Sequence, residues 1–255
     1  MKKEKPHYSY SQINMFLRCP RQYYFRYIEG KKIPPKSALT LGKSVHAGIE
    51  KNYSQKVKTH QDMATADICD AYGDAFDLLR KETLWLPEEK PGKIKDEGYG
   101  LIKVYQKEIA PSIQPATVEE KFTIEFLDVD YAFTGIMDLT TDNNLIVDHK
   151  TTTRTPSEDE IRKNLQLTAY AMGFRHLRKK QEKQLRFDYM IRKKQPEILS
   201  VSTYRDEQDI RSFLKLIGYI HEAIQSGLFY PNINNRLCNE KWCGFWDLCQ
   251  GGKKW

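Results

Sequence analysis

The sequence predicts an α/β fold with one core and appendages, and three observations lead to it. Helical patterns fill the chain up to about residue 110, and strand patterns begin near residue 117. A helix, a second pair of strands and a further helix follow before a Cys-rich tail. Hydrophobic residues make up 40% of the 255 positions, enough to bury a substantial core. Helices and strands that alternate in this way are typical of α/β proteins.

The first part of the chain is predicted to be helical. Ser9-x-x-Gln12 matches a capping box, so a helix begins there. Pro20 cannot continue a helix and is expected to stop this one. Apolar residues at helical spacing predict another helix over residues 41–53. Further helical patterns continue toward residue 110, interrupted by a polar stretch with Pro and Gly near residues 87–98.

The first predicted strand, residues 118–126, alternates between two kinds of side chain. On strict alternation, Glu120 shares a face with Val118 and Phe122, and Glu119 lies on the opposite face. Glu120 therefore falls among large apolar residues, and Glu119 does not.

A predicted hairpin follows, with its turn at residues 140–144. Side chains two positions apart on a strand point the same way, so Asp148 and Lys150 share a face. Pairing with the preceding strand brings Asp138 to the same end of the sheet. Two carboxylates and an ammonium on rigid strands can bind a divalent cation and stabilise charge on a phosphate. The alternative is an edge hairpin with solvated charges.

The second half of the chain predicts a helix, a hairpin and another helix. Ser157-x-x-Glu160 should cap one helix that runs through Met172, and on it Gln166 and Tyr170 share a face. A hairpin is expected to turn near residues 194–196, and an amphipathic helix should follow at residues 210–224.

Composition narrows the class of partner and the compartment. The net charge of +7 suits a partner with a phosphate backbone. No apolar run is long enough to span a membrane, and the opening MKKEKPHYSYSQ has no apolar segment, so we expect a soluble cytoplasmic protein without a secretory signal. In a reducing compartment, five cysteines with three near the C-terminus indicate metal binding more than disulfides.

Five short motifs in one order resemble the PD-(D/E)XK nuclease superfamily over nearly the whole chain. Within it, the sequence is similar to RecB-type exonucleases that carry an iron–sulfur cluster, such as the AddB nuclease domain and the cluster-bearing CRISPR-associated exonucleases. The motifs are Ser9-x-Ser11 with Cys19-Pro20, Gly42-x-x-x-His46, Gly135-x-x-Asp138, Asp148-x-Lys150 and Gln166-x-x-x-Tyr170.

The resemblance implies a fold and a domain plan. The fold is a restriction-endonuclease-like core, with a mixed β-sheet flanked by helices, a helical N-terminal insertion and a Cys-rich C-terminal cluster region. The plan is a single nuclease domain over residues 1–255. Residues 41–115 would be mainly helical, residues 116–205 would hold the catalytic sheet and active-site helix, and the cluster would join residues 1–40 to 229–255.

The resemblance also implies roles for individual residues. His46, Asp138, Asp148 and the His149 carbonyl would hold Mg²⁺ or Mn²⁺, and Lys150 would orient water or stabilise charge on the phosphate. Gln166 and Tyr170 would position Lys150 or the DNA backbone, the alternative being ordinary helix surface. The family also has a glutamate on the strand before the hairpin; either Glu119 or Glu120 could fill this place, and we favour Glu119 because Glu120 falls among large apolar residues. The implied catalytic set is Glu119, Asp138, Asp148, Lys150, Gln166 and Tyr170.

Four cysteines would ligate a [4Fe–4S] cluster: Cys19, Cys238, Cys243 and Cys249. The first gap of the C-terminal three, with four residues between Cys238 and Cys243, is wider than the commoner two-residue version. A zinc ion in the same four-cysteine site is the alternative.

The function implied is a metal-dependent DNA exonuclease that acts in recombination, repair or phage DNA replication. Its substrate would be DNA that is single-stranded or has single-stranded ends. The sequence has no helicase motif, so a helicase or recombinase partner would be another chain. The alternative is a non-catalytic DNA-binding protein of the same fold that holds iron–sulfur or zinc.

Overall fold

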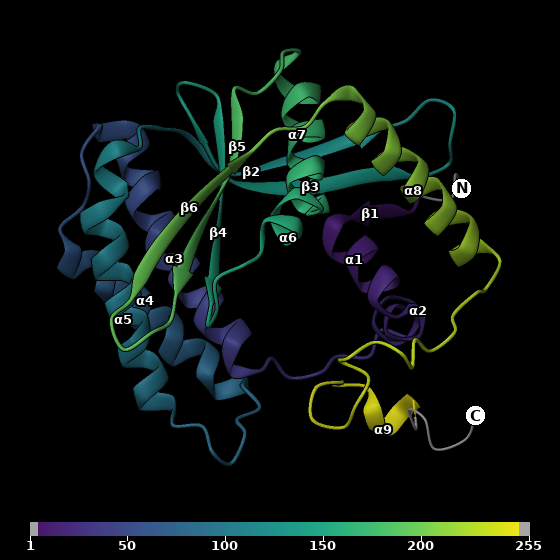
Figure 1. Ribbon diagram of the computed structural model, residues 1–255, viewed down its shortest axis with the longest axis horizontal. Helices are drawn as coiled ribbons and strands as arrows, with labels where there is room; N and C mark the ends of the chain where they lie inside the picture. Colours follow the sequence, from purple (N-terminus) through teal and green to yellow (C-terminus); the bar gives the residue numbers. More distant parts are fainter. Residues whose placement is uncertain (1–4, 250–255) are drawn as a thin grey trace. The chain divides into compact units, whose positions relative to one another are not determined.

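The computed structural model describes residues 5–249, and the chain divides into two compact units (Figure 1). Unit 1 is formed by residues 1–34, 123–135 and 206–255. Unit 2 is formed by residues 35–122 and 136–205. The long strands β2 (Pro115–Glu125) and β3 (Ala132–Thr141) each contribute residues to both units. No helix within residues 5–249 is both long and apolar enough to cross a membrane.

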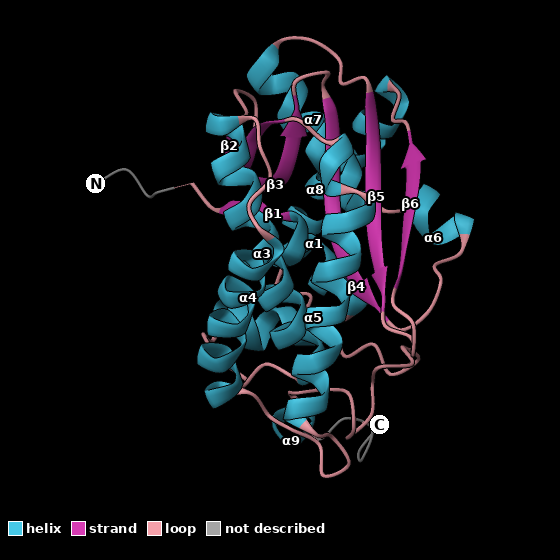
Figure 2. Ribbon diagram, turned by 90° about the vertical axis from the view of Figure 1, so that its left-hand side faces the viewer, coloured by secondary structure: helices cyan, strands magenta, loops and turns pink. Residues whose placement is uncertain are grey.

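The sheet of unit 2 is mixed, as predicted. After β3 it contains β4 (Leu145–Thr152), β5 (Gln184–Ile191) and β6 (Glu197–Thr203), which lie side by side in Figure 2. β4 runs antiparallel to β3 and parallel to β5, and β6 is antiparallel to β5. Both predicted hairpins are therefore present, and their turns fall between β3 and β4 and between β5 and β6.

Three helices cover one face of this sheet. They are α3 (Ser37–Thr59), α4 (Thr65–Leu79) and α5 (Pro91–Glu108), and short 3₁₀ turns at Arg80–Glu82 and Ala110–Ser112 follow α4 and α5. Their apolar stripes pack with Leu139, Val147 and Met190 of the strands in one buried cluster. The expected interruption near residues 87–98 ends earlier, because Pro91 occupies the first turn of α5, where a missing N–H costs nothing.

The opposite face carries α6 (Glu158–Arg162) and α7 (Leu165–Arg178). The capping box at Ser157 is present, but the single helix predicted from it is wrong. The chain leaves helical geometry near Asn164. The Asn164 side chain accepts a 2.8 Å hydrogen bond from the backbone N–H of Gln166 and so caps the start of a second helix. This new start sets the direction of α7 and of the side chains along it.

Glu119 interrupts the alternation predicted for β2. Its backbone is left-handed, with a φ of 49°, which is rare for a residue other than glycine and typical of a bulge. Val118 therefore packs with the helices α3 to α5, whereas Phe122 packs on α7, where a Cβ at Gly173 would lie 2.5 Å from its ring. Val118 and Phe122 do not share a face, and that part of the prediction is wrong.

Unit 1 begins with β1 (His7–Ser9), a strand parallel to the start of β3 that the sequence pattern did not reveal. Helix α1 (Tyr10–Arg18) starts at the predicted capping box of Ser9 and Gln12. Pro20 follows the end of α1 but also opens the next helix, α2 (Pro20–Tyr23), which continues into a π-helical turn at Tyr24–Ile28. Proline thus acts here as a start as well as a stop.

The rest of unit 1 comes from the C-terminal part of the chain. The amphipathic helix α8 (Glu207–Gln225) is present where it was predicted, and it buries Ile210, Phe213 and Ile217. It begins at a capping box made by Asp206 and Asp209. The short helix α9 (Trp246–Cys249) closes the described chain, in the Cys-rich segment.

Candidate metal centre and cysteine pocket

Two carboxylates meet where β3 and β4 pair in unit 2. Leu139 lies opposite Val147, so the adjacent pair brings Asp138 and Asp148 onto the face that carries α7. Both are tied to that helix. Gln166 Nε2 donates to Asp148 Oδ1 over 2.7 Å and to the Tyr170 hydroxyl over 2.9 Å. The Tyr170 hydroxyl donates in turn to Asp138 Oδ1 over 3.2 Å.

Lys150 completes this group on the same face of β4. Its Nζ lies 2.7 Å from Asp148 Oδ2, and the Asp148 side chain is fully buried. Within residues 5–249 this buried oxygen has Lys150 as an ion-pair neighbour but no partner that meets hydrogen-bond geometry. The pKa of Asp148 is raised to about 6; burial is the largest cause, Lys150 opposes it, and the charge of Asp138 adds to the rise.

Asp138 titrates in the opposite direction from Asp148. Burial favours its protonated form, but hydrogen bonding by His149 and the positive charge of neighbouring groups outweigh burial and hold its pKa below the ordinary value. Its Oδ2 accepts a 3.1 Å hydrogen bond from the backbone N–H of His149. The site therefore keeps one carboxylate ionised beside another that is protonated more readily, an arrangement that a bound cation would change.

His46, Glu119 and Asp138 each offer one ligand atom, and these atoms lie within 4.8 Å of one another. Nitrogen and carboxylate oxygens in such a group suit Mn²⁺, and the oxygens suit Mg²⁺. Burial raises the pKa of Glu119 to about 7, with Asp138 and Glu50 adding to the rise. A divalent ion would offset this crowding of negative charge, and the left-handed backbone of Glu119 is what turns the residue toward the group.

His46 also contacts the backbone of β4. Its Nε2 lies 2.7 Å from the His149 carbonyl oxygen, and its Nδ1 lies 3.5 Å from Asp138 Oδ2. Burial lowers the pKa of His46, which favours the neutral imidazole that metals bind. The carbonyl that was predicted to be a ligand thus lies beside the predicted histidine ligand, and one cation could bind both in place of their hydrogen bond.

The side chain of His149 lies between this group and the core, and its Nδ1 is 3.8 Å from Asp138 Oδ2. Its Nε2 lies 2.8 Å from the hydroxyl of Tyr105, which donates to the fully buried Asp188 over 3.3 Å. Tyr53 lies 3.0 Å from the same hydroxyl, and its ring stacks on the His149 imidazole. Sequence reasoning missed this network, because Tyr105 and Tyr53 have the spacing of ordinary core residues and nothing marks their hydroxyls.

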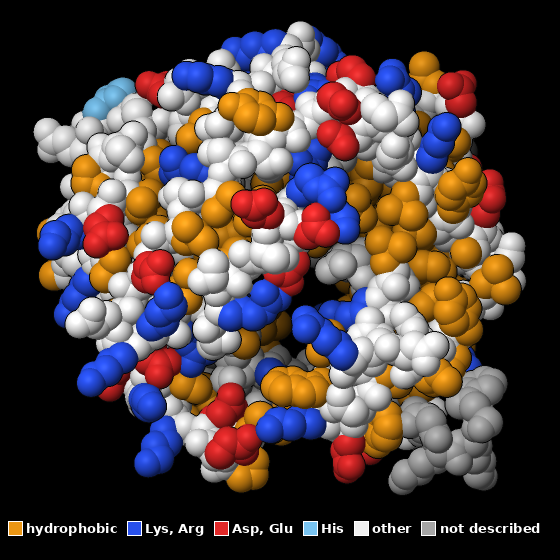
Figure 3. All heavy atoms as spheres, in the orientation of Figure 1, with side chains coloured by type: hydrophobic (Ala, Val, Ile, Leu, Met, Phe, Trp, Pro, Cys, Tyr) orange, Lys and Arg blue, Asp and Glu red, His pale blue; other side chains and the backbone are white. Residues whose placement is uncertain are grey.

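The surroundings of the site are not uniformly basic. A pocket beside the metal group is lined by Lys43 of α3, by Lys150, and by Glu50 and Glu119. On the face of the molecule in Figure 3, lysine and arginine side chains are interspersed with aspartate and glutamate. On this face the positive side chains are therefore not gathered in one patch.

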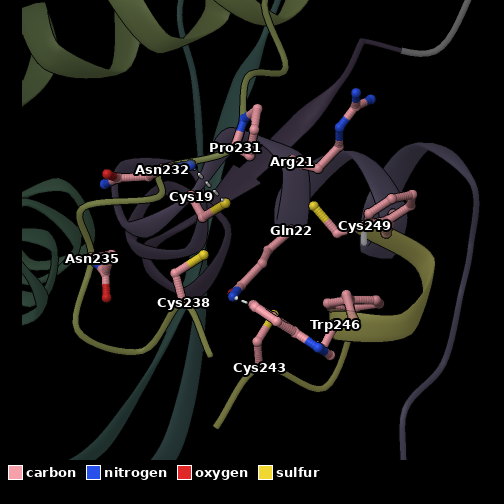
Figure 4. Close-up of a pocket in the computed structure, with 12 residues that line it drawn as sticks. Cys19, Arg21, Gln22, Pro231, Asn232, Asn235, Cys238, Cys243, Trp246 and Cys249 are labelled. Carbon is pink, nitrogen blue, oxygen red and sulfur yellow. Dashed lines mark hydrogen bonds between the residues drawn. The ribbon is translucent and has the colours of Figure 1, made fainter. Parts of the chain in front are cut away.

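The four cysteines predicted to bind a cluster line one pocket of unit 1 (Figure 4). Cys19 lies between α1 and α2, and the other three come from the C-terminal segment. Two N–H groups donate to these sulfurs: the amide of Asn232 to Cys19 over 3.4 Å and the side chain of Gln22 to Cys243 over 3.3 Å. Cys69 lies on α4, in unit 2, and is buried in its apolar core.

Burial raises the pKa of the Cys238 and Cys249 thiols, and the neighbouring cysteines raise it further. Four thiols so close together are costly to ionise without a cation among them. Within residues 5–249, however, no three of the cysteine sulfurs lie within 4.8 Å of one another.

Comparisons with known proteins bear on the family and the fold of the chain. The family model described as the PD-(D/E)XK nuclease superfamily matches residues 7–250. A crystal structure of a protein from Eubacterium rectale named "Putative exonuclease" aligns with a TM-score of 0.65 and 13% identity, covering 98% of this chain and 89% of its own. A structure named SSO0001 aligns with a TM-score of 0.45 and 15% identity, covering 98% and 88%. No curated protein matches. The likeness to the first structure confirms the predicted fold class.

Proposed function

The chain belongs to the PD-(D/E)XK nuclease superfamily, and we propose that it is a Mg²⁺- or Mn²⁺-dependent exonuclease that hydrolyses phosphodiester bonds in DNA. One observation carries the proposal. The group of His46, Glu119 and Asp138, with ligand atoms within 4.8 Å, adjoins the Asp148–Lys150 pair on the same strands. A cation site beside an ammonium can activate water and shield the charge that develops on a phosphodiester during hydrolysis.

His46, Glu119, Asp138 and the His149 carbonyl would hold the ion, together with the buried Asp148 Oδ2 that lacks a good hydrogen bond. A bound ion supplies Lewis acidity toward the phosphate and lowers the pKa of the attacking water. Lys150 remains beside Asp148 and stabilises the negative charge that develops on the phosphate as water attacks and the bond to the leaving oxygen breaks.

Gln166 and Tyr170 have a positioning role in this proposal. Gln166 donates to Asp148 Oδ1, and Tyr170 donates to Asp138 Oδ1. These bonds hold the two carboxylates in place, so that the Oδ2 atoms keep a fixed direction toward the ion. This favours a role in the site over the alternative that both are ordinary helix surface. Tyr170 is buried, which also distinguishes it from a solvated residue.

We propose a [4Fe–4S] cluster as the second cofactor, held by Cys19, Cys238, Cys243 and Cys249. The N–H groups directed at Cys19 and Cys243 support thiolate ligands, since such hydrogen bonds are common at iron–sulfur sites. Within residues 5–249 no three of the cysteine sulfurs lie within 4.8 Å of one another, a looser arrangement than a tetrahedral zinc site has. A tetrahedral zinc ion holds its four sulfurs about 3.8 Å apart, given a Zn–S distance near 2.3 Å. A cubane cluster binds each sulfur at a different corner and spreads them further.

The pathway remains recombination, repair or phage DNA replication, with a helicase or recombinase as a partner on another chain. The exonuclease assignment is tested with linear and covalently closed circular DNA of the same sequence, each incubated with Mn²⁺ or Mg²⁺. Linear DNA, single-stranded or with single-stranded ends, should be shortened from its ends while the circle stays intact. Cleavage of the circle would contradict exonuclease action. Binding without any cleavage would favour the non-catalytic DNA-binding alternative.

A further inference from the structure

A second pocket adjoins the metal centre within unit 2, and the residues assigned above do not account for it. It is lined by Lys150 and Thr151, which also line the pocket of the metal group, and it continues to Arg154, Asn164 and Tyr189. The two pockets therefore meet at Lys150. A polymer that places one phosphate at Lys150 must continue into a neighbouring space, and this pocket is one such space.

The end of β4 lines both pockets: Lys150 and Thr151 line the two, and Thr152 lines the second. Lys150 and Thr152 lie on the same face of the strand and are about 6.6 Å apart along it. This is comparable to the spacing of successive phosphates in an extended nucleic-acid strand. Thr152 Oγ1 donates to the Arg154 carbonyl over 3.0 Å and accepts from its amide over 3.2 Å. These bonds fix the turn that carries Arg154 next to the strand end.

Arg154 already binds a planar anion in this pocket. Its Nη1 donates to Glu160 Oε2 over 2.8 Å, and its Nη2 donates to Glu160 Oε1. This bidentate geometry matches a phosphodiester as well as it matches a carboxylate. Both side chains are about half exposed, at 56% and 45%, so the pair adds little to stability and exchanges readily with another anion.

We propose that Arg154 binds the phosphodiester next to the one being cleaved, and that Glu160 occupies Arg154 until nucleic acid displaces it. The inference rests on the proposed function, because it takes Lys150 as the point that marks the scissile phosphate. It adds a substrate-binding residue outside the predicted set, and a carboxylate that competes with the substrate for it.

Glu160 allows a test in which two substitutions have opposite effects. Arg154→Ala removes the phosphate ligand. Glu160→Gln removes the competing charge, yet glutamine still serves the capping box that Glu160 forms with Ser157 at the start of α6. Arg162→Ala is the matched control. Arg162 is 70% exposed, lies on the same short helix and pairs with Asp159, and it does not line the pocket.

The experiment measures Kd by fluorescence anisotropy with Ca²⁺ as a metal that supports binding without turnover. Steady-state cleavage with Mn²⁺ gives KM and kcat. The ligand is an end-labelled single-stranded oligonucleotide. A second oligonucleotide carries one uncharged methylphosphonate at the second linkage from each end. Circular dichroism and thermal melting confirm that each variant is folded.

We expect Arg154→Ala to raise Kd and KM about ten-fold, the loss of a charged hydrogen bond, with little change in kcat. Glu160→Gln should lower both constants, and Arg162→Ala should match the wild type. The wild type should bind the methylphosphonate oligonucleotide with a higher Kd than the unmodified one. The Arg154→Ala variant should bind both oligonucleotides with the same Kd. Equal Kd values for Arg154→Ala and Arg162→Ala would overturn the inference, as would a methylphosphonate effect that persists in Arg154→Ala. If the wild type binds but never cleaves, the proposed function fails while the Kd comparison still tests Arg154.

Discussion

The backbone N–H of His149 donates a 3.1 Å hydrogen bond to Asp138 Oδ2. The strand β4, which supplies the His149 carbonyl as a candidate ligand, therefore also orients the candidate ligand Asp138. The His149 carbonyl lies beside His46 on the other side of the same residue. The position of this one backbone segment therefore affects three ligand atoms. The imidazole of His149 is hydrogen-bonded to the hydroxyl of Tyr105 through its Nε2.

Tyr105→Phe should weaken metal binding without unfolding the protein. Loss of the hydroxyl releases the His149 ring and leaves Asp188 with one donor fewer, at a cost of about 1–2 kcal/mol in the free energy of unfolding. Mn²⁺ affinity, measured by calorimetry or electron paramagnetic resonance, should fall about ten-fold. Tyr53→Phe is the control, because the Tyr53 hydroxyl contacts that of Tyr105 and not His149. Equal Mn²⁺ affinities in the two variants would exclude a positioning role for Tyr105.

The metal-free protein should lose stability as the pH rises toward 7. The pKa of Glu119 is raised to about 7 by burial, so the folded state binds a proton that the unfolded state releases near its ordinary value of 4.5. The stabilisation is complete below that value and is lost as the pH rises through 7. Asp148, raised to about 6 by burial, acts in the same direction, and His46, whose pKa burial lowers, acts in the opposite direction below 6.5.

Comparison with Glu119→Gln isolates this effect. Between pH 5 and 8 in the presence of a chelator, the wild type should lose roughly 1–2 kcal/mol relative to the variant, after allowance for solvent screening. Mn²⁺ should restore the stability of the wild type at pH 8 and do less for Glu119→Gln. Glu125→Gln, exposed on the same strand, should behave like the wild type. Parallel melting curves for wild type and Glu119→Gln at every pH would show that Glu119 is not protonated in the folded state.

The cysteine pocket predicts a brown protein. Purified without air, it should absorb broadly in the visible range, and iron analysis should give about four atoms per chain. Substitution by serine at Cys19, Cys238, Cys243 or Cys249 should bleach the colour, since a hydroxyl is a poor ligand for iron. Cys69→Ser is the control, because Cys69 lies in the other core and should leave the colour unchanged. About one zinc and no iron per chain would reject the cluster and leave the nuclease proposal standing.

Much of the candidate site follows from simple periodicity. Alternation along β4 places Asp148 and Lys150 on one face, and hairpin pairing brings Asp138 to the same face, as the pattern predicted. The capping boxes at Ser9 and Ser157 also mark true helix starts, because their hydrogen bonds are local and depend on few other residues. The fold class followed from the order of such local signals.

Other features depend on contacts that no local pattern encodes. The left-handed backbone of Glu119 breaks a regular alternation, and glutamate gives no signal for it. Asn164 ends one helix and starts another in a stretch whose apolar spacing reads as continuous. The side chain of Tyr105 has the spacing of a core residue, and its link to His149 exists only once α5 packs against β4 and β5.

The central claim is that Asp148 and Lys150 act on a phosphodiester bond with a divalent metal. The most direct test is the single-turnover rate of end-labelled DNA cleavage in Mn²⁺, with Lys121→Ala as a control for the loss of an exposed lysine. Lys150→Ala should slow cleavage at least about 100-fold while Kd for DNA changes little, and a chelator should stop cleavage by the wild type. Cleavage by Lys150→Ala at the wild-type rate, or full activity with the chelator present, would contradict the account.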